Sequence, residues 1–208
     1  MRYKTGFLKL GFAAVLIFCS APAYASLVFS IQSVTASAGS TGNTLDVLLT
    51  NTGPSGVSIG GFNFEIAASD PAIVFTGVFT STVTAPYVFD GDSLFGPQID
   101  TQTSPTVIAS DISASGSAAL GSGATAGLGQ IFFNVSPTAG LGPFTLSFTG
   151  GAAGNNLSDA LGNDVPIDTF SSGSIQIGAN AVPEPSSLWL TLAGIAVLLG
   201  RGRRLRRV

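Results

Sequence analysis

The sequence predicts an all-β protein, an antiparallel β-sandwich of about eight short strands. Apolar and polar residues alternate with a period of two in several segments, which is the spacing of a strand with one buried face. Clusters of Gly, Ser, Asn and Pro separate these segments, and no helical repeat intervenes. Short strands joined by turns are typical of a sandwich. We therefore expect one all-β domain over residues 26–181, flanked by two targeting segments, residues 1–25 and 182–208.

The expected strands follow from this alternation. In GFNFEIA (residues 61–67), the apolar residues Phe62, Phe64 and Ile66 share one face. The other expected strands are residues 27–34, 44–50, 72–79, 106–113, 129–135, 143–150 and 174–178. Two longer stretches, residues 113–129 and 150–174, show no such pattern. The first is rich in Gly, Ala and Ser, and we expect it to be a flexible loop.

The basic residues lie only at the two ends of the chain. All eight Lys and Arg residues occur before Gly11 or after Gly200, whereas ten of the eleven acidic residues lie within residues 26–181. The net charge of -3 therefore averages two basic ends and an acidic body. This asymmetry predicts targeting segments around a separate domain.

The N-terminus has the parts of a signal peptide. Basic residues precede a short apolar run (residues 10–18), and Ala23 and Ala25 form the A-x-A pattern after which signal peptidase cuts. The run is shorter than the roughly 20 residues of a membrane-spanning helix. We expect cleavage before Ser26, which also removes Cys19, the single cysteine of the chain. The remaining chain then has no disulfide, thiolate nucleophile or cysteine metal site.

Residues 186–200 form an uncharged apolar run that is short for a membrane span. Fifteen helical residues extend about 22 Å at 1.5 Å per residue, and the hydrocarbon core is about 30 Å thick. Flanking serines and arginines can stretch the fit. The positive-inside bias keeps the following arginines in the cytoplasm and the preceding chain outside. This cytoplasmic stop signal comprises Arg201, Arg203, Arg204, Arg206 and Arg207.

The end of the chain resembles the PEP-CTERM sorting signal of Gram-negative bacteria. The motif Val182, Pro183, Glu184 and Pro185 precedes the apolar run with its tryptophan, and the arginines follow. The resemblance implies that an exosortase, a membrane cysteine protease or transpeptidase, recognises the signal and removes the tail. It also implies a surface-exposed or released protein in bacteria that make exopolysaccharide and biofilm. An ordinary C-terminal anchor that is never cut is the alternative.

The order of the expected strands is similar to that of the cohesin-like sandwich, a type shared with carbohydrate-binding modules. The resemblance lies in residues 33–53, 59–79 and 127–151. It implies a jelly-roll-like sandwich of about nine strands. Cohesins bind dockerins, and the resemblance assigns no residue of this chain to such a contact.

The composition excludes most catalytic chemistry and nucleic-acid binding. The chain has no His, and residues 26–181 contain no Cys, Lys or Arg. The usual nucleophile–base pairs and zinc ligands are therefore missing. A carboxylate pair that includes Glu65 is the remaining enzymatic option, with a solvated surface carboxylate as its alternative. A domain without basic residues cannot neutralise phosphates, so we expect neither an enzyme nor a nucleic-acid partner.

Calcium is the one cofactor that the sequence suggests. Two loops offer oxygen ligands for a hard cation, although neither has EF-hand spacing and Asp also forms turns. The candidate ligands are Asp90, Asp92 and Asp100 in the first loop and Asp159, Asp164 and Asp168 in the second. Bound calcium could bridge the acidic domain to acidic polysaccharide. Neutral glycans could instead dock on Tyr87 and Phe89, for which core packing is the alternative.

Two functions therefore stay open at the level of the sequence. The first is a non-enzymatic surface or extracellular-matrix protein that contributes protein or glycan contacts. Its expected partners are signal peptidase, an exosortase, the membrane before processing, and an exopolysaccharide or surface protein. The second is a calcium-dependent, carbohydrate-binding or protein-binding module, held at the membrane by an uncleaved anchor.

Overall fold

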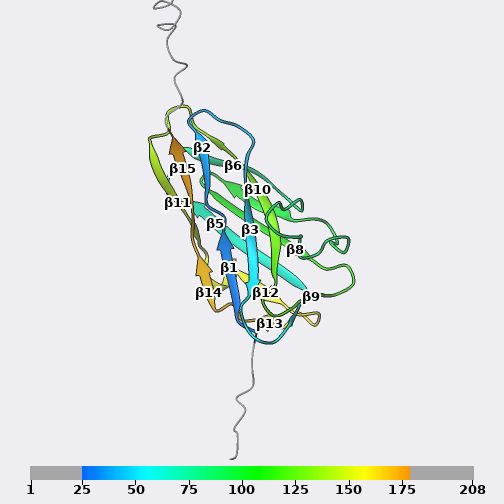
Figure 1. Ribbon diagram of the computed structural model, residues 1–208. Helices are drawn as coiled ribbons and strands as arrows, with labels where there is room; N and C mark the ends of the chain where they lie inside the picture. Colours follow the sequence, from blue (N-terminus) through cyan, green and yellow to red (C-terminus); the bar gives the residue numbers. More distant parts are fainter. Residues whose placement is uncertain (1–24, 179–208) are drawn as a thin grey trace, which may run out of the picture.

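The computed structural model describes residues 25–178 and shows two β-sheets packed face to face (Figure 1). This confirms the predicted all-β sandwich. The predicted signal peptide and C-terminal apolar helix lie in residues 1–24 and 179–208, outside the described residues. The five-stranded sheet has the order β14 (Thr169–Ser171), β1 (Leu27–Ile31), β3 (Asn43–Asn51), β10 (Thr125–Val135) and β6 (Ile73–Phe79).

The second sheet has eight strands and is organised around β5. One edge of β5 pairs with β8, and the other edge pairs first with β12 and then with β11. Its strands are β13 (Asp164–Val165), β12 (Asn156–Ser158), β5 (Gly61–Ala68), β11 (Gly142–Phe148), β15 (Gly173–Gly178) and β2 (Val34–Ser37), with β8 (Thr106–Ile112) and β7 (Gln98–Thr103) beyond β5. The remaining elements are the pair β4 (Val57–Ile59) and β9 (Ala118–Leu120) and the short helix α1 (Gly151–Gly154).

The hydrophobic core lies between the two sheets. Alternate residues of β1 and most of β5 are buried, as the period of two predicts. Phe29 of β1 contacts Phe148 of β11 across the sandwich, with 5.7 Å between ring centroids. The ring centroid of Phe62 lies 5.9 Å from that of Phe64 and 5.8 Å from that of Phe89. Each fully buried phenylalanine contributes about 1.5–3 kcal/mol to folding.

The first and last strands of the described chain pass from the five-stranded sheet to the eight-stranded sheet side by side. The sequence predicts one strand over residues 27–34, but β1 ends at Ile31 and β2 continues in the opposite sheet. β14 and β15 divide in the same way, and the pairs β1–β14 and β15–β2 are parallel. The predicted antiparallel arrangement is therefore wrong for these two strand pairs. Gly173 permits the crossing, because a Cβ there would lie 2.7 Å from the carbonyl oxygen of Ile31.

Both stretches without a sequence pattern contain strands. Residues 113–129 include β9 and the start of β10, so the predicted flexible loop is wrong for these residues. Residues 150–174 include α1, β12, β13 and β14. Residues 25–178 contain fifteen strands, more than the eight or nine expected, because several are only two to four residues long. Such short strands depend on their neighbours, as β12 depends on β5.

The described chain begins and ends at opposite ends of the sandwich (Figure 1). β15 runs parallel to β2, and its last residue, Gly178, lies at the far end from residue 25. Within residues 25–178, no helix has the length and apolar character needed to cross a membrane.

Gly60 lies where two backbone segments approach closely. A Cβ at this position would lie 2.3 Å from the carbonyl oxygen of Asp159. The Gly60 N–H donates to the carbonyl of Ser158 at 2.6 Å, and its carbonyl accepts from Ser113 at 2.9 Å. The backbone at Gly60 cannot move away without losing these hydrogen bonds.

We expect Gly60→Ala to lower the free energy of unfolding by about 2 kcal/mol or more, measured by urea denaturation.

Gly121→Ala is the matched control for this prediction. A Cβ on Gly121 would meet nothing within 4 Å, so the substitution should change the free energy of unfolding by less than about 1 kcal/mol. Equal losses from the two substitutions would contradict the proposed clash at Gly60.

Candidate functional site

Most of the predicted processing residues lie outside the described chain. These are Ala23, the motif Val182, Pro183, Glu184 and Pro185, and the five arginines from Arg201 to Arg207. Ala25 and Ser26 are the first described residues. Ala25 packs against the core, and the Ser26 carbonyl accepts the N–H of Thr52 at 2.7 Å, so the contacts of the sandwich begin one residue before the predicted cleavage point.

The first predicted calcium loop uses its carboxylates for contacts within the protein. Asp92 accepts the hydroxyls of Ser113 and Ser115 and the N–H of Ser115 at 3.0 Å. These hydrogen bonds lower the pKa of Asp92 from its ordinary value. Asp100 lies on β7 and accepts a hydroxyl from β8 at 2.8 Å, while Asp90 is exposed. Asp92 thus ties the loop before β7 to the segment after β8.

The second predicted calcium loop also serves the local structure. The side chain and backbone of Asn163 and the backbone of Leu161 donate to Asp159 and lower its pKa. Asp168 accepts the N–H of the first residue of β1 at 2.8 Å, and Asp164 is exposed. Across residues 25–178, no three acidic side chains form a group that could hold a metal ion. The calcium prediction stays a prediction.

The lowered pKa values of Asp92 and Asp159 give a direction for the effect of acid. Both carboxylates are stabilised as anions in the folded chain. Their contribution to stability is therefore present above the ordinary pKa of aspartate, about 4, and is lost as the pH falls through the lower folded value.

A buried hydrogen-bond network anchors the 80–97 loop. The Asp111 carboxylate, 4% exposed, accepts the hydroxyl of Tyr87 at 2.5 Å and that of Ser93 at 2.6 Å. Ser93 in turn accepts the N–H of Gly96. Burial, and then the hydrogen bond and charge of Asp111, raise the pKa of Tyr87 far above its ordinary value. Tyr87 and Phe89 are both buried in the core, which confirms core packing for them over glycan docking.

Three exposed apolar residues lie where the anchored loop meets the end of β8, and we call them the Ile112 cluster: Leu94 and Phe95 of the loop and Ile112 of β8. These side chains are 45%, 67% and 47% exposed. The Leu94 N–H donates to the Ile112 carbonyl at 3.0 Å, so the two residues lie side by side at the end of β8. A Cβ on Gly61 would lie 3.0 Å from Cγ2 of Ile112, so the Ile112 side chain lies against the backbone of Gly61 on the paired strand. Exposed apolar clusters of this kind mark binding surfaces.

Sequence reasoning missed the Ile112 cluster. Along β8, Val107, Ala109 and Asp111 are buried, whereas Ile112 is exposed. A carboxylate therefore takes an inward position and an isoleucine an outward one. This inversion of the expected polarity is the signal in the sequence that could have found the cluster.

Glu65 is a structural carboxylate. The Thr149 hydroxyl donates to it at 2.7 Å, and the Glu65 N–H donates to the side-chain oxygen of Asn155 at 2.9 Å. A Cβ on Gly150 would overlap the carboxylate. These contacts tie Glu65 to the turn around α1, so it is not simply a solvated surface carboxylate, and they favour a structural role over a catalytic one.

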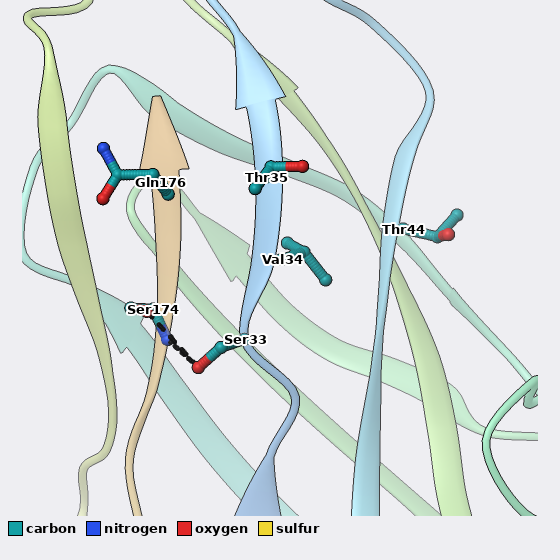
Figure 2. Close-up of a pocket in the computed structure, with 6 residues that line it drawn as sticks. All are labelled: Ser33, Val34, Thr35, Thr44, Ser174 and Gln176. Carbon is teal, nitrogen blue, oxygen red and sulfur yellow. Dashed lines mark hydrogen bonds between the residues drawn. The ribbon is translucent and has the colours of Figure 1, made fainter. Parts of the chain in front are cut away.

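A polar groove lies between β2 and β3. Figure 2 shows Val34 and Thr35 of β2 on one side and Thr44 of β3 on the other. The groove has a volume of about 580 Å³, and its lining residues carry no charge: Ser33, Val34, Thr35, Thr44, Ser174 and Gln176. A second hollow continues along β2 past Ser37, Ser40 and Asn43 to Gly178. The Ser174 N–H donates to the Ser33 hydroxyl at 3.1 Å, which joins the two crossing segments.

The described domain has a cohesin-like fold. The seventh type I cohesin of ScaB from Pseudobacteroides cellulosolvens is similar, with a TM-score of 0.55 and 16% identity over 76% of this chain and 96% of that one. The sixth cohesin of scaffoldin B from Acetivibrio cellulolyticus, solved in complex with a dockerin, has a TM-score of 0.56 and 15% identity over 74% and 99% of the chains. CaCohA2 from Clostridium acetobutylicum has a TM-score of 0.54 and 16% identity over 76% and 94%. The predicted resemblance in fold is confirmed.

The chain also carries a sorting motif. Residues 181–207 match the PEP-CTERM protein-sorting motif, which confirms the predicted signal at the C-terminus. The motif indicates export and exosortase-dependent sorting to the surface or exterior of the cell. No curated protein sequence matches the chain.

Proposed function

We propose that the protein is a non-enzymatic component of the cell surface or extracellular matrix. Signal peptidase removes residues 1–25, the tail holds the chain in the membrane, and an exosortase then cleaves at the PEP motif. The match of residues 181–207 to the PEP-CTERM motif carries this proposal. A role linked to exopolysaccharide or biofilm is part of it. The cohesin-like fold and the lack of His, Cys, Lys and Arg in residues 26–181 support a binding role over catalysis.

The Ile112 cluster is the proposed binding surface of the sandwich for a protein partner. Asp111 precedes Ile112 and also holds Ser93, the residue before Leu94. The cluster is therefore fixed before a partner arrives, and a preorganised surface loses less entropy on binding. The domain has ten carboxylates and no basic side chain over residues 26–181. We expect the partner to place apolar side chains against the cluster and basic groups around it.

The second candidate is a calcium-dependent or carbohydrate-binding module that an uncleaved tail holds in the membrane. The exposed carboxylates of Asp90 and Asp164 favour its calcium part. A bound ion raises the melting temperature by mass action. Thermal unfolding in chelator and in millimolar calcium tests whether the domain binds calcium. An unchanged melting temperature would remove calcium from the proposal.

We expect the native protein to end within Pro183, Glu184 and Pro185. Intact mass spectrometry of protein recovered from the producing cells and from their medium measures this end, and any added mass reveals an attachment. A variant with all three residues replaced by Ala should keep Val208, because the extended motif is lost. Native protein that retains Val208 and stays in the membrane would contradict cleavage and leave the plain anchor.

A further inference from the structure

The outer edge of β2 has no strand partner. Within residues 25–178, β2 is the last strand of its sheet and pairs only with β15. Its other edge faces the groove in Figure 2, across from β3. β3 pairs with β1 only from Val47 to Asn51, so Asn43 and Thr44, which line the two hollows, have no strand on that side. An unpaired edge is a template for another strand.

Two of the other sheet edges, β13 and β6, carry features that block such pairing, and β2 does not. At the opposite end of its sheet, β13 contains Asp164 and precedes Pro166. β6, at the end of the five-stranded sheet, is covered by β7, where the Gln102 amide donates to the Phe75 carbonyl. Charges, prolines, bulges and covering segments are the usual protections of an edge. β2 has no charge or proline, and its register with β15 is unbroken.

We propose that β2 pairs antiparallel with β2 of a second copy of this chain, which joins the two eight-stranded sheets. A two-fold axis perpendicular to the sheet keeps the inner faces of both copies on the same side. Val34 and Ala36 are only partly buried and pack on the core from the rim of the groove. In the pair, Val34 and Ala36 of the second copy cover the same two residues of the first copy. The apolar side chains of β2 are therefore buried against each other.

Electrostatics also favour this edge as the contact. Residues 26–181 hold ten carboxylates and no basic group, so two copies repel each other over most approaches. The lining of the groove carries no charge. We therefore expect pairing to strengthen as salt screens the repulsion between the domains.

The antiparallel arrangement has a consequence for where pairs form. β2 runs parallel to β15, which ends at Gly178, so the two Gly178 ends of a pair point in opposite directions. If the tail holds the chain in the membrane, as the proposed function states, two copies in one membrane cannot pair. Pairing then joins released molecules or molecules on facing surfaces. This consequence rests on the proposed function, whereas the pairing itself does not.

Sedimentation velocity of the native protein recovered from the producing cells tests the pairing. The C-terminus is first determined by mass, so the result does not depend on where the chain ends. We expect a monomer–dimer equilibrium that shifts toward dimer between about 0.05 and 0.5 M salt, because the Debye length falls about threefold over this range. Thr35→Asp, on the exposed face of β2, places like charges across the pair and should weaken dimerisation about fivefold or more.

Thr145→Asp is the matched control, because Thr145 is exposed on β11 in the same sheet but away from its edge. It should leave dimerisation unchanged. Since Cys19 is the single cysteine and precedes Ser26, Thr35→Cys allows selective capture of pairs with a short bis-maleimide, and Thr145→Cys should not cross-link. A protein that stays monomeric at 0.5 M salt, or a dimer that Thr35→Asp and Thr145→Asp affect equally, overturns the proposal.

Discussion

Asp111→Ala is expected to lower the free energy of unfolding by about 3 kcal/mol. The substitution removes the acceptor of the buried Tyr87 hydroxyl, and it also takes the acceptor from the Ser93 hydroxyl and the Ile112 N–H. A buried polar group without a partner costs about 1–3 kcal/mol. Tyr87 bears most of this cost because it is buried, and the less buried groups can turn to water. Urea denaturation of the processed protein measures the loss.

Tyr87→Phe is the matched control for Asp111→Ala. It removes one donor and leaves the Asp111 carboxylate with its bonds from Ser93 and Ile112, so we expect a loss of about 1 kcal/mol. If the two substitutions cost the same, the carboxylate does not organise the network. The native protein should therefore be the most stable of the three, Tyr87→Phe the next, and Asp111→Ala the least stable.

The single tyrosine of the processed chain provides a second measurement. Tyr3 and Tyr24 precede the predicted cleavage point, so phenolate absorbance reports on Tyr87 alone. Because its pKa is raised in the folded state, the stability from the protonated phenol is present below about pH 10 and is lost as the pH rises toward the folded value. Asp111→Ala removes the hydrogen bond and the charge but not the burial, so Tyr87 should ionise at lower pH than in the native protein.

Ile112→Asp is expected to weaken binding of a protein partner roughly 30-fold or more, with little change in stability. Ile112 is 47% exposed, so the fold does not require its side chain to be apolar. A carboxylate at the centre of an apolar contact costs about 2 kcal/mol or more at a binding hot spot, which weakens binding roughly 30-fold. Quantitative capture from the producing culture, with the immobilised native domain and the variant side by side, measures the loss.

Val74→Asp is the control for this substitution. Val74 is also a β-branched residue on a strand and is 38% exposed, but it lies on β6 in the other sheet. A protein that the native domain and Val74→Asp both retain, and that Ile112→Asp loses, supports the assigned surface. Retention by both variants would place the contact elsewhere on the sandwich.

The strands that could be predicted from the sequence are those whose burial alternates strictly. β5 and β1 are examples, because every second residue points into the core and the pattern records this directly. β12 and β13 could not be predicted, since two or three residues carry no period. Their place depends on the register with β5, which pairs Leu157 with Phe62.

The candidate site shows the same limit. Asp111 and Tyr87 are separated by 24 positions in the chain, and nothing in the local sequence of either residue indicates the other. The calcium loops were suggested by composition, and the structure instead shows Asp92 and Asp159 accepting hydrogen bonds from nearby hydroxyls and amides. Acidic residues in turns serve both purposes, so composition alone could not separate them.

The sequence by itself determined the sorting motif and the class of the fold. Both are local properties: the motif is a contiguous run at residues 181–207, and strand character is an alternation within a few residues. Only the tertiary structure decided the surfaces. Ile112 lies on the exposed side of β8, opposite Gly61 of β5, and β2 has a free edge because β1 and β2 divide between two sheets. Exposure and pairing depend on which distant segments meet, and such contacts are formed only when the whole chain folds.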